Sequence, residues 1–208
     1  MDSLTQIVLG AACGEAVLGK KIGNRALFFG AIGGTIPDMD VFIGKLLYNN
    51  QIDAMAFHRG FMHSFLFAIL AAVAFGILVF WIYNRGKRHS MTTRKDWIWL
   101  FFASIFTHPI LDSFTAYGTQ LFVPFSNYRV AFNNIAVADP FYTLPFLVAL
   151  IIVMCFKRTS FKRRFFLKIG FGISSLYMLF TFVNKYHVHG VYKKSLKLEG
   201  IEYVRFQT

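Results

Sequence analysis

The sequence has little charge for its length, and most of that charge is of one sign. Only 15% of the 208 residues are charged, with 22 Lys or Arg against 10 Asp or Glu. A soluble domain usually carries about a quarter charged residues, whereas 56% of this chain is hydrophobic and 26 residues are Phe. A water-soluble fold of this size cannot bury so much apolar surface. The composition excludes an ordinary soluble domain and favours a membrane protein.

Cysteine is scarce, and the N-terminus has no early basic residue. Cys13 and Cys155 each lie in an apolar run, which excludes a disulfide framework and a thiolate metal site. The first basic residue is Lys20, so the chain start does not resemble a secretory signal peptide. The net charge of +12 would suggest nucleic acid in a soluble chain. Here the basic residues form short runs between apolar segments, so we predict no nucleic-acid partner.

The sequence contains six long apolar runs. A spanning helix needs roughly 20 such residues, so we predict an all-α, polytopic membrane helix bundle of about five or six transmembrane or re-entrant helices. We place a membrane-embedded domain at residues 1–184 and a short polar, extracytoplasmic tail at 185–208. The first run is rich in Gly and Ala, which favours close helix packing or a re-entrant segment. The runs are Leu4–Gly19, Ala26–Gly44, Phe61–Tyr83, Trp97–Phe114, Pro140–Phe156 and Phe165–Asn184.

Charges are segregated between the two predicted faces. Basic runs follow the first, third and fifth segments, at residues 20–25, 85–95 and 157–168. Lys- and Arg-rich loops stay in the cytoplasm, so we predict a multi-pass protein with both chain ends outside. Only Glu15 and Asp96 map inward, and we expect Glu15 to pair with Lys20 or Arg25. The outward acids are Asp2, Asp38, Asp40, Asp53, Asp112 and Asp139.

Four polar clusters fall on the predicted outer side. Pro37 disfavours an unbroken helix, so Asp38 and Asp40 project from an irregular turn, which membrane depth tolerates only beside protein or water. His108 and Asp112 are four residues apart and share one helix face. The clusters are Pro37-Asp38-Met39-Asp40, His58-Arg59-Gly60-Phe61-Met62-His63, His108-Pro109-Ile110-Leu111-Asp112 and Asp139-Pro140.

Such a gathering of ionisable groups predicts a metal centre. An ionisable side chain in lipid costs roughly 3 kcal/mol unless it finds a partner. His and Asp together suit Zn²⁺ or Mn²⁺, and the number of donors suits one or two ions. Asp2 is either a further ligand or a helix cap. The candidate ligands are Asp38, Asp40, His58, His63, His108, Asp112 and Asp2.

Structural interpretations of the same clusters stay open. The Pro-Asp-x-Asp motif also suits a helix terminator, and His58 and His63 also suit interfacial hydrogen bonding. His108 and Asp112 also suit a structural pair within a bundle. Asp139 before a proline is also an ordinary helix N-terminus.

The outer loop after the fourth segment carries candidate substrate-binding residues. Arg59 and Arg129 are the only outer arginines before the tail, and guanidinium suits phosphate. An interfacial aromatic loop with a snorkelling arginine is the structural alternative. For general base we consider Asp112 or Asp139. The candidate substrate-binding residues are Arg59, Arg129, Thr115, Tyr117 and Gln120.

The same motifs, with the opening Met-Asp-Ser-Leu-Thr-Gln, Tyr-Gly-Thr-Gln-Leu-Phe-x-Pro-Phe-Ser and Asp-Pro-Phe-Tyr-Thr, resemble the YdjM-like family. The resemblance runs from Met1 to about Pro145. It implies a prokaryotic inner-membrane protein, described as a metal-dependent hydrolase, with a metal site at Asp38, Asp40, His58, His63, His108 and Asp112. Relatives often carry His where this chain has Gln6, and they commonly continue beyond this chain's end. One interpretation of the tail is therefore the start of a truncated extracytoplasmic domain.

Three classes of function follow from these observations. The first is a membrane-bound metal-dependent hydrolase that cleaves an ester or phosphoester bond of a lipid or lipid-linked substrate at the outer face. The second is a transporter or ion-binding protein that uses the His/Asp cluster for translocation. The third is a scaffold that uses the metal for folding. The apolar inner halves of the segments, such as Ala68–Phe80, disfavour the transporter.

Overall fold

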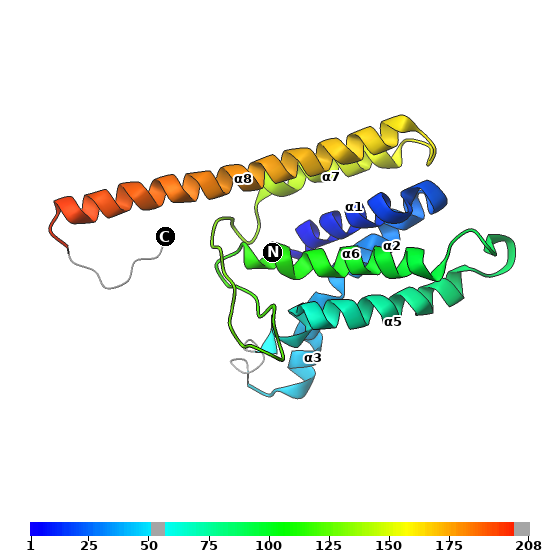
Figure 1. Ribbon diagram of the computed structural model, residues 1–208, viewed down its shortest axis with the longest axis horizontal. Coiled ribbons are helices and arrows are strands. Elements are labelled where there is room, and N and C mark those ends of the chain that lie inside the picture. Colours follow the sequence, from blue (N-terminus) through cyan, green and yellow to red (C-terminus); the bar gives the residue numbers. More distant parts are fainter. Residues whose placement is uncertain (51–56, 202–208) are drawn as a thin grey trace.

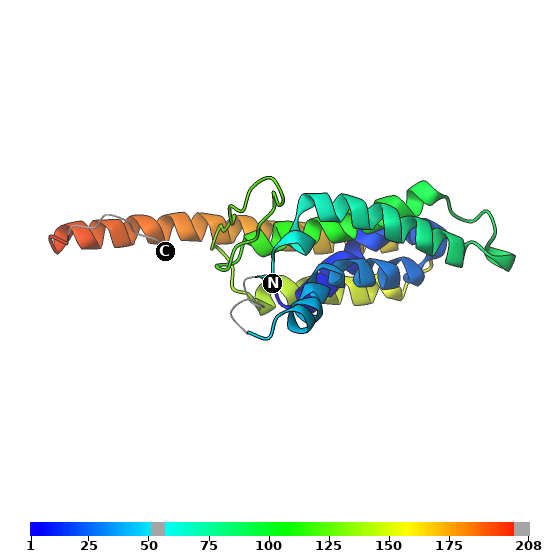
Figure 2. The same cartoon turned by 90° about the horizontal axis from the view of Figure 1, so that it is seen from below.

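The structure is a computed structural model that describes residues 1–50 and 57–201, and it is all-helical as predicted. Asp53 and the end of the tail lie outside the described residues. The longer helices run side by side along the long axis (Figures 1 and 2). The described helices are α1 (Ser3–Ile22), α2 (Asn24–Thr35), α3 (Asp40–Leu47), α5 (Phe65–Tyr83), α6 (Arg94–Ser113), α7 (Pro140–Met154) and α8 (Phe161–Leu198), with 3-10 turns η1 (Pro37–Met39), η2 (Phe61–His63) and η3 (Gly86–Arg88).

Apolar helices of membrane length are present. By length and composition α5 and α8 can each cross a membrane, and the bent pair of α2 with η1 and α3 counts as a third if it is one broken span. The shorter α7 is also apolar. Large apolar side chains such as Leu70, Trp81 and Phe180 are more than half exposed. That exposure suits a lipid environment, because a soluble monomer rarely shows such extended apolar surface.

Glycines bring α1 and α2 into close contact. Gly23, with φ of 63°, joins the two helices directly. Gly10 and Gly14 of α1 face Gly30 and Gly34 of α2, and a Cβ built on Gly30 would lie 2.8 Å from the Gly14 Cα. Small residues spaced four apart let two helix backbones approach closely. The predicted tight packing of the first segment is therefore observed. It fixes the position of the C-terminal end of α2, which precedes the Pro37–Asp40 cluster.

Substituting Gly30 with alanine is expected to destabilise the bundle by about 1–3 kcal/mol, because the added methyl meets backbone atoms that cannot rotate away. Gly172→Ala is the matched control, since nothing lies within 4 Å of a Cβ at Gly172 in α8. The measurement is the unfolding midpoint of both variants in detergent. Equal midpoints for the two variants would show that the close contact at Gly30 does not contribute to the stability of the bundle.

The second predicted segment breaks where proline predicts. α2 ends at Thr35, and Pro37 opens the 3-10 turn η1 before α3 begins, with a bend of 44° between the two parts. This turn lies at the same end of the bundle as the N-terminus (Figure 1). The break therefore leaves irregular backbone, and the carboxylates of Asp38 and Asp40, beside the other polar clusters.

The last helix is longer than the sequence indicated. α8 continues through the boundary predicted at Asn184 and ends at Leu198. It projects past the other helices at the end that carries the N-terminus (Figure 2). The described part of the predicted tail is thus a helical extension, because no proline or glycine cluster interrupts the chain after Asn184.

Candidate metal centre

Four side chains from three elements bring one donor atom each to a single point. Asp38, His63, His108 and Asp112 form a group whose donor atoms all lie within 4.8 Å of one another. The Nε2 atoms of His63 and His108 are 3.1 Å apart. Asp38 Oδ1 lies 3.5 Å from His63 Nε2 and 3.3 Å from His108 Nε2. The group is buried except for Asp38, whose side chain is 24% exposed.

The spacing of these donors fits one tetrahedral metal ion. Ligands about 2.0–2.1 Å from a tetrahedral zinc lie about 3.3 Å from one another. Asp112 Oδ2 is 3.4 Å from His63 Nε2 and 3.8 Å from His108 Nε2, so five of the six donor pairs fall between 3.1 and 3.8 Å. The four atoms therefore match one ion, and they do not by themselves supply a second.

Chain geometry explains why these residues meet. Asp38 lies in η1, at the break that Pro37 imposes, and His63 ends η2 just before α5 begins. His108 and Asp112 lie one turn apart on α6, which contacts both α1 and α2. The packing of α2 against α1 and α6 therefore sets the position of Asp38 relative to the histidines.

Both histidines turn their Nε2 atoms toward the group. His108 Nδ1 donates to the Gly34 carbonyl oxygen at 2.6 Å, which leaves Nε2 as the acceptor in neutral imidazole. His63 Nδ1 lies 3.1 Å from Asp40 Oδ2, so a carboxylate faces that nitrogen as well. In their neutral forms with Nε2 unprotonated, the two imidazoles would place lone pairs 3.1 Å apart beside carboxylates, and a cation between them would stabilise that arrangement. The residues present thus fit a metal ion, and the His108–Gly34 bond is a supporting contact typical of metal-bound histidine.

Asp40 and His58, both predicted ligands, lie beside the four-atom group. Asp40 Oδ1 contacts His58 Nδ1 at 2.7 Å, and its Oδ2 accepts from the Arg59 backbone N–H at 3.0 Å. Asp40 is 1% exposed. This arrangement suits a carboxylate that orients two imidazoles, those of His58 and His63, more than one that binds the ion itself.

Gln6 holds Asp112 in place, a role that residue spacing did not indicate, although the family resemblance had drawn attention to this position. Its Nε2 donates to Asp112 Oδ1 at 2.9 Å and to the His108 carbonyl at 3.3 Å. The Met1 amine also contacts Asp112 Oδ1. These donors occupy Oδ1, so Oδ2 faces the histidines. No spacing rule could have identified Gln6, because its partners are more than 100 residues away.

The local charge favours a divalent cation. Asp38, Asp40 and Asp112 supply three carboxylates, and the nearby positive groups are the Arg59 guanidinium and the Met1 amine, both of which contact Asp112. With both histidines neutral the site carries one excess negative charge, and burial makes uncompensated charge costly. A divalent ion would reverse that imbalance, leaving room for an anionic ligand.

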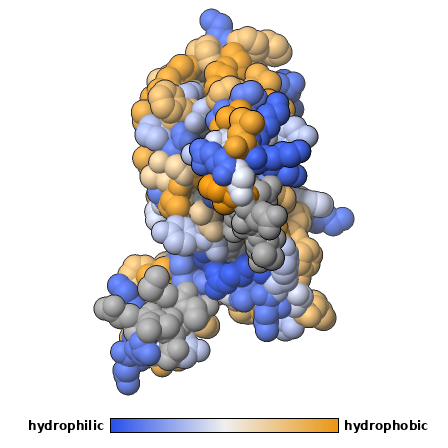
Figure 3. All heavy atoms as spheres, turned by 90° about the vertical axis from the view of Figure 1, so that its left-hand side faces the viewer, coloured by the Kyte–Doolittle hydropathy of each residue, from blue (hydrophilic) through white to orange (hydrophobic). Residues whose placement is uncertain are grey.

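A pocket of about 270 Å³ adjoins the group and is lined by His58, Arg59, Tyr117 and Arg129. Arg59 is 6% exposed, has φ of 63°, and lies with Nε 3.5 Å from Asp112 Oδ2. Its guanidinium stacks over the Tyr117 ring at 5.3 Å. A non-glycine residue held in this backbone region often marks a functional site. Seen from this end, hydrophilic residues gather among exposed hydrophobic ones (Figure 3).

The remaining predicted substrate residues support this pocket from outside. Thr115 is fully buried, accepts from Arg59 and donates to the Asp112 carbonyl. The backbone N–H of Gln120 donates to the Arg59 carbonyl at 3.2 Å, and its side chain donates to the Asn127 carbonyl. Both residues therefore position Arg59 and the loop.

Asp139 and Asp2 cap helices and are not part of the four-donor group. Asp139 accepts from the backbone N–H groups of Phe141 and Tyr142 at the start of α7, and from the Tyr177 hydroxyl at 2.9 Å. Asp2 accepts from the Thr5 backbone at the start of α1. The capping interpretation thus accounts for both, since an N-cap carboxylate satisfies otherwise unpaired donors.

Fold and site together define an all-helical membrane protein with a His/Asp group that could hold a metal ion. The chain matches the model of the YdjM inner membrane protein family over residues 1–188, and it belongs to that family. It is 31% identical over 159 residues to the uncharacterized protein YfhP of Bacillus subtilis (strain 168), covering 73% of this chain and 46% of that protein.

A second relative is the inner membrane protein YbcI of Escherichia coli (strain K12). It is 32% identical over 118 residues, covering 55% of this chain and 61% of that protein. The chain thus spans about half the length of the curated relatives it matches. No solved structure matches the chain.

Proposed function

We propose that this protein is a membrane-bound, metal-dependent hydrolase that cleaves an ester or phosphoester bond. The observation that carries the proposal is a largely buried set of four closely spaced donors beside a pocket with two arginines. Asp38, His63, His108 and Asp112 would hold one Zn²⁺ or Mn²⁺. When bound, such an ion acts as a Lewis acid and lowers the pKa of a coordinated water.

The chain's own residues supply the rest of the proposed site. Asp38 is the one donor residue that is partly exposed, so it lies where a substrate approaches. His58 lines the pocket, and Asp40 lies against its Nδ1, which leaves its Nε2 able to take or give a proton. This arrangement makes His58 a better general acid or base than Asp112, whose oxygens face other partners, or Asp139, which caps α7.

Arg59 and Arg129 would bind an anionic group of the substrate. Arg129 donates from Nη2 to the His58 carbonyl at 3.4 Å, which orients its side chain at the pocket. Guanidinium binds phosphate with paired hydrogen bonds. Because basic loops stay inside, we place the protein as a multi-pass protein of the cytoplasmic membrane with this pocket at the outer face. A lipid or lipid-linked substrate then reaches the pocket from the outer leaflet.

Removing the metal is expected to abolish turnover. Purified protein in detergent would be assayed after chelation and after return of Zn²⁺ or Mn²⁺, on p-nitrophenyl esters, p-nitrophenyl phosphates and phosphatidic acid in mixed micelles. We expect turnover of at least one class with metal, none after chelation, and recovery on return of the ion. His63→Ala should remain inactive with metal present, whereas His89→Ala, on the exposed loop between α5 and α6, should not.

Turnover that survives chelation or His63→Ala would remove the enzyme proposal. A metal-loaded protein that hydrolyses none of the three classes would favour an ion-binding or structural role for the same donors.

A further inference from the structure

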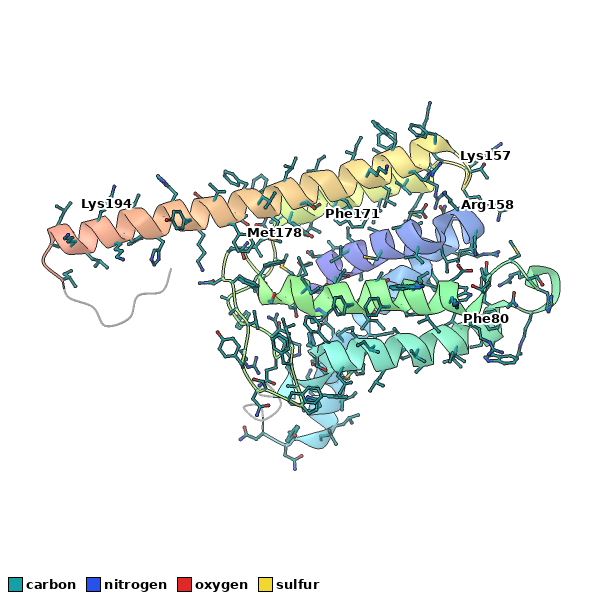
Figure 4. All side chains as sticks on the ribbon, in the orientation of Figure 1. Phe80, Lys157, Arg158, Phe171, Met178 and Lys194 are labelled. Atoms are coloured by element: carbon teal, nitrogen blue, oxygen red, sulfur yellow. The ribbon has the colours of Figure 1, made fainter. Side chains whose placement is uncertain are left out.

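A second pocket lies at the opposite end of the bundle from the metal group. It has a volume of about 230 Å³ and lies between the end of α1 and the first turns of α8. Figure 4 shows Arg158 at the turn between α7 and α8, with Phe171 further along α8. Four of its lining residues are basic and come from three separate parts of the chain: Lys20, Arg158, Arg164 and Lys168.

The acidic residues nearby are already paired. Glu15 also lines the pocket, but both of its oxygens accept from Arg163, each at 2.6 Å. Asp96, the other acid predicted on this side, pairs with Lys21 at 2.6 Å. Arg158 donates to the Lys21 carbonyl, a bond that fixes its direction and leaves its charge uncompensated. Within the described residues, the pocket therefore has an excess of positive charge.

The other pocket walls are apolar. Ala16 lines it from α1, and Leu167 and Phe171 line it from α8. Phe171 lies toward the middle of the helix bundle from the charged turn (Figure 4). A ligand that fits has an anionic head at the basic rim and an apolar chain along α8. Basic residues that serve only to orient a protein in the membrane need to lie near its cytoplasmic surface. Orientation does not require basic residues from three segments to line the same pocket.

We propose that this pocket binds the phosphate headgroup of an anionic phospholipid, with an acyl chain against Leu167 and Phe171. Basic pockets between helices at the cytoplasmic face are suited to such headgroups. Lys20, Arg158, Arg164 and Lys168 contact the phosphate, and the Glu15–Arg163 pair holds α1 and α8 at the required separation. The inference does not depend on the hydrolase activity proposed above.

The test is lipid-dependent stabilisation of the purified full chain in detergent. Dioleoyl phosphatidylglycerol, added at about ten times its dissociation constant, should raise Tm by about 3–6 °C. Dioleoyl phosphatidylcholine, which has no net charge, should not. In the double variant Lys20→Gln with Lys168→Gln, the shift should fall below about 1 °C. The matched control is Lys193→Gln with Lys194→Gln, which removes the same charge from the far end of α8 and should keep the full shift.

Two further arms separate a lipid site from a simple anion site. Inorganic phosphate and glycerol 3-phosphate carry the headgroup chemistry without the chain, and they should not reproduce the shift at equal concentration. Full stabilisation by either would overturn the lipid assignment. An unchanged shift in the Lys20/Lys168 variant, or an equal loss in the Lys193/Lys194 control, would overturn the pocket. If the double variant unfolds without lipid, Arg164→Gln alone tests the same contact.

Discussion

Replacing His63 or His108 with alanine is expected to weaken binding of Zn²⁺ by at least about 100-fold. Each imidazole supplies one of four donors, and changes even to supporting residues typically reduce metal affinity 10–100-fold. The measurement is metal content per chain after dialysis, followed by competition with a chelator of known affinity. Such a loss would show that the four-donor group is a metal site, whatever reaction it serves.

The controls for this prediction come from the same chain. His89→Ala removes an exposed imidazole whose ring contacts Ser90, and it should leave metal content unchanged. Asp40→Asn should give an intermediate loss of about 10–100-fold, because Asp40 lies beside the Nδ1 atom of His63 without joining the four donors. Helix content by circular dichroism should be the same in all variants. Full metal content in either His63→Ala or His108→Ala would contradict the site.

Replacing Arg163 with methionine is expected to destabilise the protein by about 3–5 kcal/mol, because it leaves Glu15 as a buried charge without its partner. Arg163 is 2% exposed and Glu15 5%. Arg163 also donates to the Asn24 side chain at 2.7 Å and to the Phe156 carbonyl at 2.9 Å, so it joins α1, the start of α2 and the turn before α8. The measurement is the free energy of unfolding in a detergent titration.

A double variant separates the lost ion pair from lost packing. Glu15→Gln added to Arg163→Met removes the stranded charge, so we expect it to recover part of the loss. The neighbouring Arg164→Met is the matched control in detergent without anionic lipid, where it should change stability by less than about 0.5 kcal/mol because Arg164 is exposed. A double variant less stable than the single one, or equal losses at positions 163 and 164, would contradict this explanation.

The ion pair of Glu15 shows a limit to what can be predicted from sequence. We expected Glu15 to pair with Lys20 or Arg25, because helix neighbours interact at short spacing. That expectation was wrong, since the partner is Arg163, 148 residues away. A rule based on helix spacing considers only partners that are near in sequence. The packing of α8 against α1 determines which guanidinium reaches the buried carboxylate.

The sequence alone determined the helical class, the apolar character and the polar clusters, because hydrophobic run length, proline and four-residue spacing act locally. It placed the α2 break at Pro37, and it put His108 and Asp112 on one face of α6. It could not separate donors from supporting groups. Asp38 and Asp40 are two residues apart, yet Asp38 joins the four donors while Asp40 lies against His58 and His63.

Only the tertiary structure decided those roles, because they depend on how helices pack. The glycine contact between α1 and α2 determines where the Gly34 carbonyl meets His108. Every residue has a backbone carbonyl, so the sequence does not indicate which one binds a histidine. The same packing carries Gln6 to Asp112. The sequence thus determined which residues lie in the polar clusters, because its patterns act locally. The packing distances between helices determined which of their atoms face one another.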